Sequence, residues 1–321
     1  MTDAPHVLIA DKLSPLAAEV FTRRGIAVDT RTGLSGEDLK ACIDAYDGLA
    51  IRSATTVTPE IVEAATRLKV IGRAGIGVDN INIDAASARG IVVMNTPFGN
   101  SITTAEHALS LIMSLARKIP QANASTHAGK WEKSRFMGTE LYGKTLGLIG
   151  CGNIGRIVAS RAQGMKMKVV ACDPYLASEH AQEMQVEKLE LEALLARADI
   201  ITLHTPLNDS TRHLLNARTL GQAKPGVMIV NCARGGLIDE AALKEAVEAG
   251  HVAGAALDVF EQEPAKENPL FGMEPVICTP HLGASTQEAQ VNVAVHVAEQ
   301  MADYLLQCAV TNSLNMPSVS A

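Results

Sequence analysis

Short apolar runs alternate with amphipathic segments over the N-terminal third of the chain. Five of these runs have the length and composition of strands, at residues 7–10, 27–30, 49–52, 70–73 and 91–95. The segments between them begin where a capping residue precedes proline or an acidic turn, as at Ser14, Ser35 and Thr58. This alternation predicts a parallel α/β layer that forms a domain of its own.

One long helix is predicted over residues 100–119. Its apolar positions repeat with helical spacing, and Pro120 marks its end. The next residues, 121–142, are polar and irregular and contain the only tryptophan, Trp131. A helix of this length between two α/β series is expected to connect two domains.

A second α/β series follows, with six predicted strands. They lie around residues 149, 169 and 200 and over residues 227–231, 254–257 and 276–279. Six strands complete a dinucleotide-binding sheet. Residues 287–307 then form a helix with an apolar stripe. Because this helix has no sheet of its own to cover, we expect it to pack against the N-terminal layer and to make that domain discontinuous.

A glycine pattern stands at the start of the second series. The apolar run 146–149 leads into Gly150-x-Gly152-x-x-Gly155, and a helical segment follows. In a dinucleotide-binding turn the first glycine allows the tight turn, the second lets the backbone approach a pyrophosphate, and the third lets helix and strand pack closely. The phosphates would then lie at the helix N-terminus.

The next strand ends at Asp173, at the distance from the glycines that the dinucleotide fingerprint requires. A carboxylate there accepts hydrogen bonds from both ribose hydroxyls and repels a 2′-phosphate, which predicts NAD rather than NADP. Position alone supports equally a turn residue before Pro174.

These patterns together predict an α/β fold of two domains. A Rossmann-type doubly wound parallel sheet that binds NAD is assigned to residues 99–287. A flavodoxin-like, discontinuous substrate domain is assigned to residues 1–98 and 288–321.

Composition narrows the possible partners. With 321 residues, 47% hydrophobic and 20% charged, the chain has room for two ordinary globular domains, and its net charge of −7 argues against nucleic acid or a membrane surface as partner. The N-terminus lacks an apolar signal segment, and no run is long enough to span a membrane, so a cytoplasmic location is expected. The six cysteines show no paired spacing; we interpret them as buried thiols and expect no metal.

Three residues are candidates for the chemistry beside a nicotinamide. Arg234, Glu263 and His281 each follow a predicted strand, so all map to the carboxyl edge of the second sheet, where ligands of open α/β folds bind. An imidazole held by a carboxylate can deliver and recover one proton near neutral pH, and an arginine matches a substrate carboxylate. Taken singly, Arg234 could be a surface charge, Glu263 a loop acid before Pro264, and His281 a loop histidine whose hydrogen bonds are made within the protein.

Seven motifs, in order along nearly the whole chain, carry a family resemblance. They are Ile51-Arg-Ser-Ala-Thr, Gly72-Arg-Ala-Gly-Ile-Gly-Val-Asp-Asn, Met94-Asn-Thr-Pro-Phe-Gly-Asn-Ser, Phe136-Met-Gly-Thr-Glu-Leu, Asn231-Cys-Ala-Arg-Gly-Gly, Ala256-Leu-Asp-Val-Phe and Pro280-His-Leu-Gly-Ala-Ser-Thr. The chain resembles the D-isomer-specific 2-hydroxyacid dehydrogenases, and within them it looks most like the branch that acts on D-3-phosphoglycerate in serine biosynthesis.

This resemblance implies a reversible, NAD-dependent oxidation of D-3-phosphoglycerate to 3-phosphohydroxypyruvate, with hydride transfer at C2. In the reductive direction His281, held by Glu263, would give its proton to the 2-oxo oxygen while Arg234 binds the carboxylate. Besides the three glycines, the family's cofactor contacts carry over to Asn153, Ile154, Asp173, Thr205, Cys232, Ala233, Arg234, Asp258, His281, Gly283 and Ala284. Thr205 could instead cap a strand. Ile76 replaces a small polar residue of the relatives, which leaves only a backbone contact.

Substrate selection is expected from the N-terminal loops. The candidate substrate residues there are Arg52, Ser53, Arg73, Ala74, Gly75 and Asn100. Two arginines beyond the one needed for a carboxylate suggest a second anion such as phosphate; alternatively, Arg52 and Arg73 form interdomain salt bridges. The resemblance suggests that Lys133 and Arg135 reach the site of a neighbouring subunit.

Two other functions fit the same residues. One is reduction of another small 2-oxo acid such as hydroxypyruvate, glyoxylate or sulfopyruvate, and the other is an NAD-sensing binding protein. The resemblance implies a homodimer or homotetramer with residues 100–119 and 121–142 at the contact. The phosphoglycerate enzymes commonly continue into regulatory domains; because the sequence stops at Ala321, we expect no feedback control through such a domain.

Overall fold

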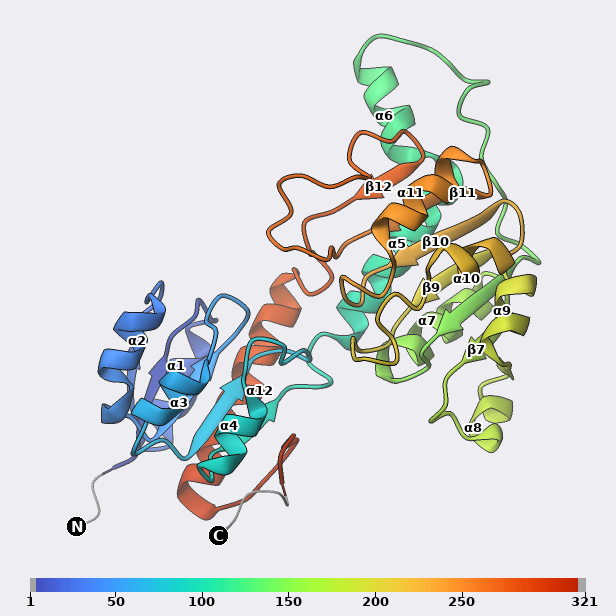
Figure 1. The fold of residues 1–321 in the computed structure, drawn as a ribbon. Coiled ribbons are helices and arrows are strands. Elements are labelled where there is room, and N and C mark those ends of the chain that lie inside the picture. Colours follow the sequence, from blue (N-terminus) through green and yellow to red (C-terminus); the bar gives the residue numbers. More distant parts are fainter. Residues whose placement is uncertain (1–3, 317–321) are drawn as a thin grey trace. The chain divides into compact units, whose positions relative to one another are not determined.

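The computed structural model describes residues 4–316 of the chain. It contains two compact units, Ser101–Gly283 and, from both ends of the sequence, Met1–Asn100 with Ala284–Ala321 (Figure 1). Residues 1–3 and 317–321 of the predicted substrate domain lie outside the described part. Each unit is built around one parallel sheet, as the α/β prediction requires.

The first unit contains a five-stranded sheet in the order β2-β1-β3-β4-β5, with every pair parallel. This is the flavodoxin-like strand order. All five predicted strands are confirmed, with ends that differ by one residue at most. They are β1 (His6–Ile9), β2 (Ala27–Thr30), β3 (Gly48–Ile51), β4 (Val70–Arg73) and β5 (Val92–Asn95).

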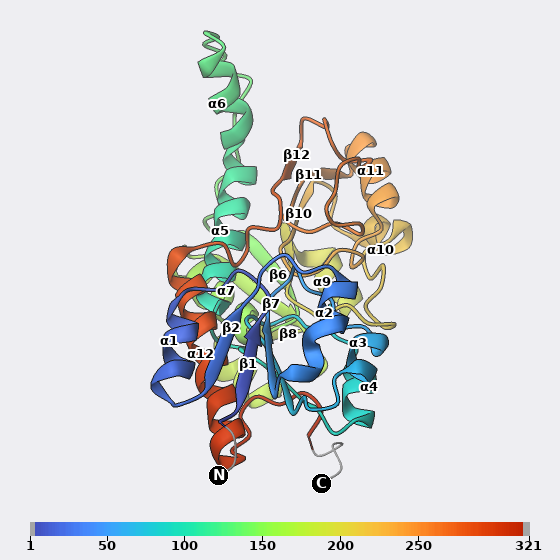
Figure 2. The same ribbon diagram turned by 90° about the vertical axis from the view of Figure 1, so that its left-hand side faces the viewer.

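Helices cover both faces of this sheet (Figure 2). One face packs against α1 (Leu16–Arg23) and α12 (Gln287–Gln307), where Val297 and Met301 are fully buried with Phe21. The closing helix therefore packs against the N-terminal layer, as expected for a helix without a sheet of its own to cover. The other face packs against the remaining helices, α2 (Gly36–Cys42), the 3-10 turn η1 (Ile43–Ala45), α3 (Pro59–Ala64) and α4 (Ile83–Ala88).

The second unit contains a seven-stranded parallel sheet in the order β12-β11-β10-β9-β6-β7-β8. Its strands are β6 (Thr145–Ile149), β7 (Lys168–Cys172), β8 (Glu187–Lys188), β9 (Ile200–Leu203), β10 (Val227–Asn231), β11 (Val252–Leu257) and β12 (Val276–Cys278). The sequence predicts six of them and misses β8, because two exposed charged residues at a sheet edge carry no apolar pattern. The order from β8 to β11 is that of a dinucleotide-binding sheet.

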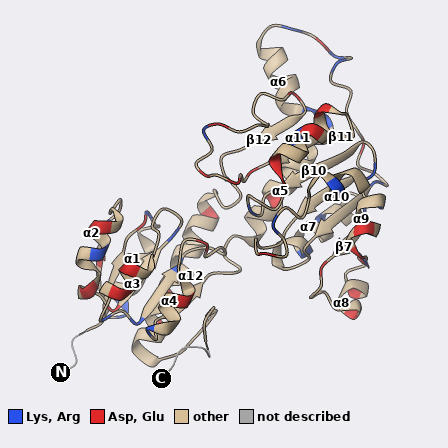
Figure 3. Ribbon diagram, in the orientation of Figure 1, with Lys and Arg blue, Asp and Glu red and all other residues tan. Residues whose placement is uncertain are grey.

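Helices also cover both faces of the second sheet. Its strands β6, β9, β10, β11 and β12 contain no Lys, Arg, Asp or Glu, and charges concentrate on helices and loops (Figure 3). The helices of one face are α5 (Ser101–Arg117) and α7 (Asn153–Gly164), and α8 (Ser178–Glu183) adds Ala181 to the same core. Those of the other face are α9 (Leu191–Arg197), α10 (Ala217–Gln222) and α11 (Glu240–Glu248).

The single helix predicted over 100–119 is wrong at its end. The chain breaks at Lys118, which has a left-handed φ of 52°, and a second helix, α6 (Ile119–His127), follows in a region predicted to be irregular. Proline lacks an N–H and its ring clashes with the carbonyl four residues earlier, so α5 cannot continue through Pro120, whereas a first helical turn tolerates it. The carbonyl of Ala116 instead accepts a hydrogen bond from the Thr139 N–H at 2.8 Å.

Three further expectations from the sequence concern the cysteines, membrane spans and metal sites. The interpretation of all six cysteines as buried thiols holds for Cys151 and Cys232, whereas Cys42 and Cys172 are half-buried and Cys278 and Cys308 are exposed. Between residues 4 and 316 the structure has no helix long and apolar enough to cross a membrane. In the same residues, no group of three or more His, Cys, Asp or Glu side chains is arranged to hold a metal ion.

Candidate active site

The glycine loop between β6 and α7 has the shape that a pyrophosphate needs. Gly150 adopts a φ of 92°, where a side chain would be strained, and a Cβ on Gly155 would lie 2.5 Å from the Gly150 carbonyl oxygen. By contrast, a Cβ on Gly152 would meet nothing within 4 Å. Gly152 is also the N-cap of α7 and provides no side chain to cap the first N–H groups. An open approach to an uncapped helix N-terminus fits a dinucleotide phosphate.

Asp173 is bonded to this loop. Its Oδ2 accepts a hydrogen bond from the Cys151 N–H at 2.7 Å, and its Oδ1 accepts one from the Tyr175 N–H at 2.8 Å. The second bond forms the turn around Pro174 that the sequence left open as an alternative. The first bond fixes the carboxylate beside the glycine loop, and each oxygen retains a further acceptor position. The ribose contact itself stays a prediction.

His281 and Glu263 form a hydrogen-bonded pair. The His281 Nδ1 lies 2.6 Å from Oε2 of Glu263, and Oε1 of the same carboxylate accepts from the Phe260 N–H at 3.0 Å. Burial alone would raise the pKa of Glu263, but the hydrogen bonds from His281 and Phe260 hold that pKa below its ordinary value. Because a carboxylate only accepts, Nδ1 carries a proton, and Nε2 is the ring nitrogen left for a substrate.

A buried carboxylate, Asp258, holds the backbone around His281. Its Oδ1 accepts from the Leu282 N–H at 2.7 Å and its Oδ2 from the Gly283 N–H at 2.8 Å. His281 has a φ of 55°, which side-chain-bearing residues rarely adopt, and its N–H donates to the Asp258 carbonyl at 2.9 Å. Asp258 therefore stabilises the left-handed turn that carries His281. The contact with the nicotinamide carboxamide, implied for Asp258 by resemblance, stays a prediction.

His107 of α5 completes this network. Its Nε2 lies 3.2 Å from Oδ1 of Asp258 and 3.3 Å from the hydroxyl of Thr279, which itself donates to Oδ1 at 2.6 Å. Burial alone would raise the pKa of Asp258, but the bonds from His107 and Thr279 hold it below the ordinary value. Sequence reasoning missed His107, because a polar residue beside an apolar helix stripe gives no signal of a partner far along the chain.

Arg234 lies in the turn after β10. The Asn231 amide shapes this turn by accepting from the Ala233 N–H at 3.0 Å and donating to the Arg234 carbonyl at 2.8 Å. The Arg234 guanidinium donates to the Ala233 carbonyl at 2.6 Å. Burial raises the pKa of the neighbouring Cys232 thiol, which therefore stays neutral.

The three catalytic candidates lie at one edge of the second sheet. β10, β11 and β12 are parallel neighbours, so the turns that follow them project from the same side. Arg234 follows β10, Glu263 lies in the segment after β11, and His281 follows β12. Thr205 follows β9 at that edge and is half-buried, beside His204, whose pKa burial lowers to about 4.

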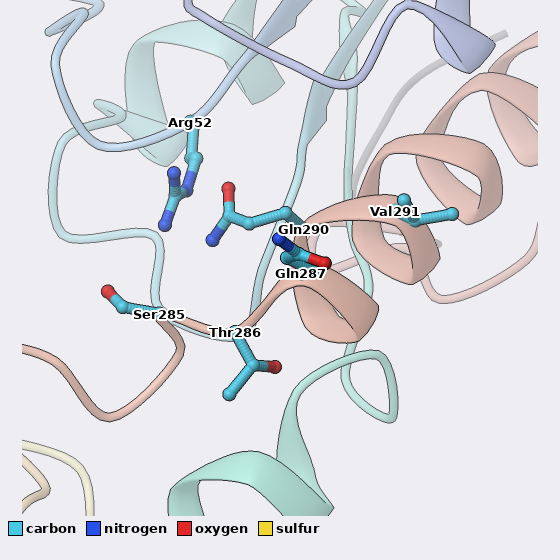
Figure 4. A pocket seen from close by; sticks show the side chains of 6 residues that line it. All are labelled: Arg52, Ser285, Thr286, Gln287, Gln290 and Val291. Atoms are coloured by element: carbon cyan, nitrogen blue, oxygen red, sulfur yellow. The ribbon is translucent and has the colours of Figure 1, made fainter.

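In the first unit, Arg52 lines a pocket at the N-terminus of α12. The other lining residues are Ser285, Thr286, Gln287, Gln290 and Val291 (Figure 4). Burial lowers the pKa of the Arg52 guanidinium, and among residues 4–316 this side chain makes no salt bridge. A half-buried cation that forms no salt bridge favours an anionic ligand. The sequence singled out Arg52 but missed Gln290, because a glutamine inside a helix repeat has no distinctive pattern.

The loop after β4 is held by hydrogen bonds of its own. The Gly75 N–H donates to the Thr96 hydroxyl at 2.7 Å, and the Asn95 amide donates to the Ile76 carbonyl at 2.6 Å. The backbone of Ile76, which is predicted to contact the cofactor, therefore already accepts one bond at its carbonyl. The Arg73 side chain lies against Gly75.

Arg135 is exposed in the irregular segment after α6. It forms salt bridges with Glu132 at 3.2 Å and Glu274 at 2.7 Å within its own chain. A role for Arg135 at a neighbouring subunit's site would require exchange of these partners.

Each predicted site residue belongs to one of the two units. The first unit holds Arg52, Ser53, Arg73, Ala74, Gly75, Ile76, Asn100 and Ala284. The second holds Gly150, Gly152, Asn153, Ile154, Gly155, Asp173, Thr205, Cys232, Ala233, Arg234, Asp258, Glu263, His281, Gly283 and Arg135.

Comparison with known proteins identifies the family of the chain. Residues 109–283 match the family described as D-isomer specific 2-hydroxyacid dehydrogenase, NAD binding domain. Over 98% of its length, the chain is 48% identical to a D-3-phosphoglycerate dehydrogenase of Synechocystis sp., covering 56% of that protein, and 47% identical to one of Archaeoglobus fulgidus, covering 60%. The chain thus spans less than two thirds of the length of these curated relatives.

A solved structure agrees over the whole fold. A glyoxylate reductase from Paecilomyes thermophila has a TM-score of 0.90 at 29% identity, with 98% of this chain and 99% of that chain covered. The family match spans the glycine loop, Asp258 and His281, and it confirms the family and the cofactor expected from the sequence. The chain is therefore a member of the D-isomer specific 2-hydroxyacid dehydrogenases and carries their NAD binding domain.

Proposed function

We propose that the protein oxidises D-3-phosphoglycerate to 3-phosphohydroxypyruvate with NAD, reversibly, in serine biosynthesis. The observation that carries this proposal is the pair between His281 Nδ1 and Glu263 Oε2, at 2.6 Å, in the same unit as the glycine loop. The choice of substrate is supported by the relatives with 47% and 48% identity, both named D-3-phosphoglycerate dehydrogenase.

The second unit exchanges a proton with the substrate and binds the substrate carboxylate. Bound NAD supplies a hydride acceptor, and NADH a hydride donor, for substrate C2. In oxidation, Nε2 of His281 takes the proton of the C2 hydroxyl, and the Glu263 carboxylate stabilises the resulting imidazolium through Nδ1. In reduction, the same nitrogen returns the proton to the 2-oxo oxygen. Arg234 binds the substrate carboxylate through parallel hydrogen bonds.

In the first unit, Arg52 is proposed to bind the second anion of the substrate. Arg52 supports this role because it is half-buried, lines a pocket with Gln290 and forms no salt bridge among the described residues. Arg73, Ser53 and Asn100 are further candidates. A sulfonate would satisfy Arg52 as well as a phosphate does, so sulfopyruvate belongs among the substrates to be tested.

The second unit also supports a homodimer, or a tetramer built from dimers. In Figures 1 and 2, α6 projects from the rest of this unit, and it has no buried residue. The following segment exposes Trp131 at 87%, Met137 at 77% and Tyr142 at 71%. Large apolar side chains exposed along one segment support an interaction surface there. Sedimentation velocity at micromolar concentration is expected to show no monomer, and a variant with Trp131→Ser and Met137→Ser is expected to dissociate. The cytoplasmic location stays a prediction from the sequence.

The test of the function is a comparison of substrates. NADH oxidation is followed with 3-phosphohydroxypyruvate, hydroxypyruvate, glyoxylate and sulfopyruvate side by side. We expect the highest kcat/KM with the phosphorylated acid, and an Arg52→Met variant is expected to lose that preference. Preference for another acid would replace the substrate while keeping the family chemistry. NADH binding without turnover of any acid would favour an NAD-sensing protein.

A further inference from the structure

A second buried carboxylate, Asp11, lies beneath the loop that carries Arg52. Asp11 is 4% exposed and follows β1, whose partner strand β3 ends just before Arg52. Its Oδ2 accepts three backbone bonds, from the N–H groups of Arg52 at 2.6 Å, Ala54 at 3.2 Å and Thr55 at 3.2 Å. Its Oδ1 accepts the Thr55 hydroxyl at 2.6 Å. One side chain thus organises the whole turn from 52 to 55.

Asn80 holds the same turn through its carbonyls. Its Nδ2 donates to the Arg52 carbonyl at 2.8 Å and to the Thr55 carbonyl at 2.6 Å. The backbone of Arg52 is therefore fixed on both sides, at its N–H by Asp11 and at its carbonyl by Asn80. The sequence pattern predicts no role for Asp11 or for Asn80.

Asp11 holds the backbone of the loop, whereas the Arg52 side chain lines the pocket. The carboxylate of Asp11 is directed at backbone donors, and among the described residues no salt bridge joins it to the Arg52 guanidinium. The negative charge still favours the cationic form of Arg52. The guanidinium itself lines the pocket with Gln290.

We propose that Asp11, with Asn80, is a positioning residue for substrate recognition that sets the direction of Arg52 toward the second anion of the substrate. This inference rests on the proposed function of Arg52. Small displacements of a binding group lower substrate affinity strongly, so loss of Asp11 is expected to act on KM rather than on the proton transfer at His281.

The chain contains a matched control for this test. Asp47 is buried to the same degree, at 5% exposed, and lies beside the same two strands, just before β3. It accepts a bond from the His6 N–H at 3.1 Å and pairs with Arg67 and Lys69, each at 3.2 Å. It therefore stabilises the opposite end of the sheet, away from the Arg52 turn.

The experiment compares Asp11→Ala, Asp11→Asn and Asp47→Ala in the full chain. Asp11→Ala is expected to raise the KM for 3-phosphohydroxypyruvate by about tenfold or more, with kcat and the NADH dissociation constant within about twofold. The KM for hydroxypyruvate, which lacks the phosphate, is expected to change little. Asp11→Asn keeps an acceptor for the three N–H groups and can donate to the Thr55 hydroxyl, so it is expected to restore most of the affinity. Asp47→Ala is expected to lower the melting temperature without changing either KM.

Asn80→Ala repeats the test if Asp11→Ala fails to fold. Folded Asp11 and Asn80 variants with an unchanged KM would overturn the inference, and so would an equal rise of KM for both acids. Arg52→Met distinguishes the two levels of the proposal. If Arg52→Met raises the KM for the phosphorylated acid while the Asp11 and Asn80 variants do not, only the positioning role fails. If Arg52→Met itself leaves KM unchanged, the proposed anion contact fails.

Discussion

The Nδ1 of His281 lies 2.6 Å from Oε2 of Glu263, while the backbone turn that carries His281 is bonded to a different carboxylate, that of Asp258. One acid thus contacts the imidazole and the other fixes the main chain. Substitution of Glu263 and substitution of Asp258 are therefore expected to have different effects.

Removal of the imidazole tests the proton transfer. His281→Ala is expected to lower kcat by about two to four orders of magnitude, the range for loss of a general acid, and to leave NADH affinity nearly unchanged. Glu263→Gln keeps an acceptor for Nδ1 but removes the charge that stabilises the imidazolium, so a smaller loss is expected. Single-turnover kinetics and NADH fluorescence titration measure the two quantities. A His281→Ala enzyme with most of its turnover would place the proton donor elsewhere.

Asp258→Asn tests the buried network. An amide presents N–H groups where the carboxylate now accepts bonds, so the free energy of unfolding at neutral pH is expected to fall by about 1–3 kcal/mol. Because the folded pKa of Asp258 is lowered, its charge contributes stability above the ordinary carboxyl pKa of about 3.9, and this contribution is lost as the pH falls through the folded value. The difference between the two proteins in urea denaturation is therefore expected to shrink below pH 4 or so. A constant difference from neutral to acid pH would contradict the charged state assigned to Asp258.

The glycine loop allows a test of cofactor binding with an internal control. Gly152 has ordinary extended backbone and open space at its Cβ position, so Gly152→Ala is expected to keep the melting temperature and to raise the NADH dissociation constant by about tenfold, or about 1.4 kcal/mol. Gly155→Ala would place a Cβ 2.5 Å from the Gly150 carbonyl oxygen and is expected to destabilise the fold by about 1–3 kcal/mol. Unchanged NADH binding in Gly152→Ala would show that the phosphates bind elsewhere.

The position of Asp173 predicts the coenzyme preference. Its carboxylate is fixed beside the glycine loop by the Cys151 N–H, where it would repel a 2′-phosphate. Asp173→Ser keeps an acceptor for that N–H and removes the charge, so the kcat/KM with NADPH relative to NADH is expected to rise about 10- to 100-fold. Equal preference in both proteins would leave only the turn-forming role of Asp173.

Sequence patterns predict the parts of this molecule that depend on local periodicity. The five strands of the first unit follow from apolar spacing within short windows, and the glycine turn follows from glycines placed between an apolar run and a helical segment. The pairing of His281 with Glu263 can also be predicted from the sequence, because parallel strands bring their carboxyl ends to one edge of the sheet.

The missed features depend on residues far apart in the chain. Asp11 bonds to a turn 41 to 44 residues away, and Asp258 pairs with a histidine on a helix that precedes it by most of the second unit. A buried aspartate next to a strand looks the same in sequence whether it supports a site, as Asp11 does, or the other end of the sheet, as Asp47 does. The break at Lys118 was missed for a different reason, since Pro120 ends one helix and lies in the first turn of the next.

The placement of α12 has a consequence for synthesis of the chain. The face of the first sheet that packs on Val297 and Met301 stays uncovered until α12 (Gln287–Gln307) has been made, whereas the second unit is complete at residue 283. On the ribosome, the second unit is therefore expected to fold before the first, although its sequence begins later. Pulse proteolysis of stalled nascent chains that expose residues 1–283 is expected to leave Ser101–Gly283 protected and the N-terminal segment cleaved, so that the order of folding reverses the order of translation.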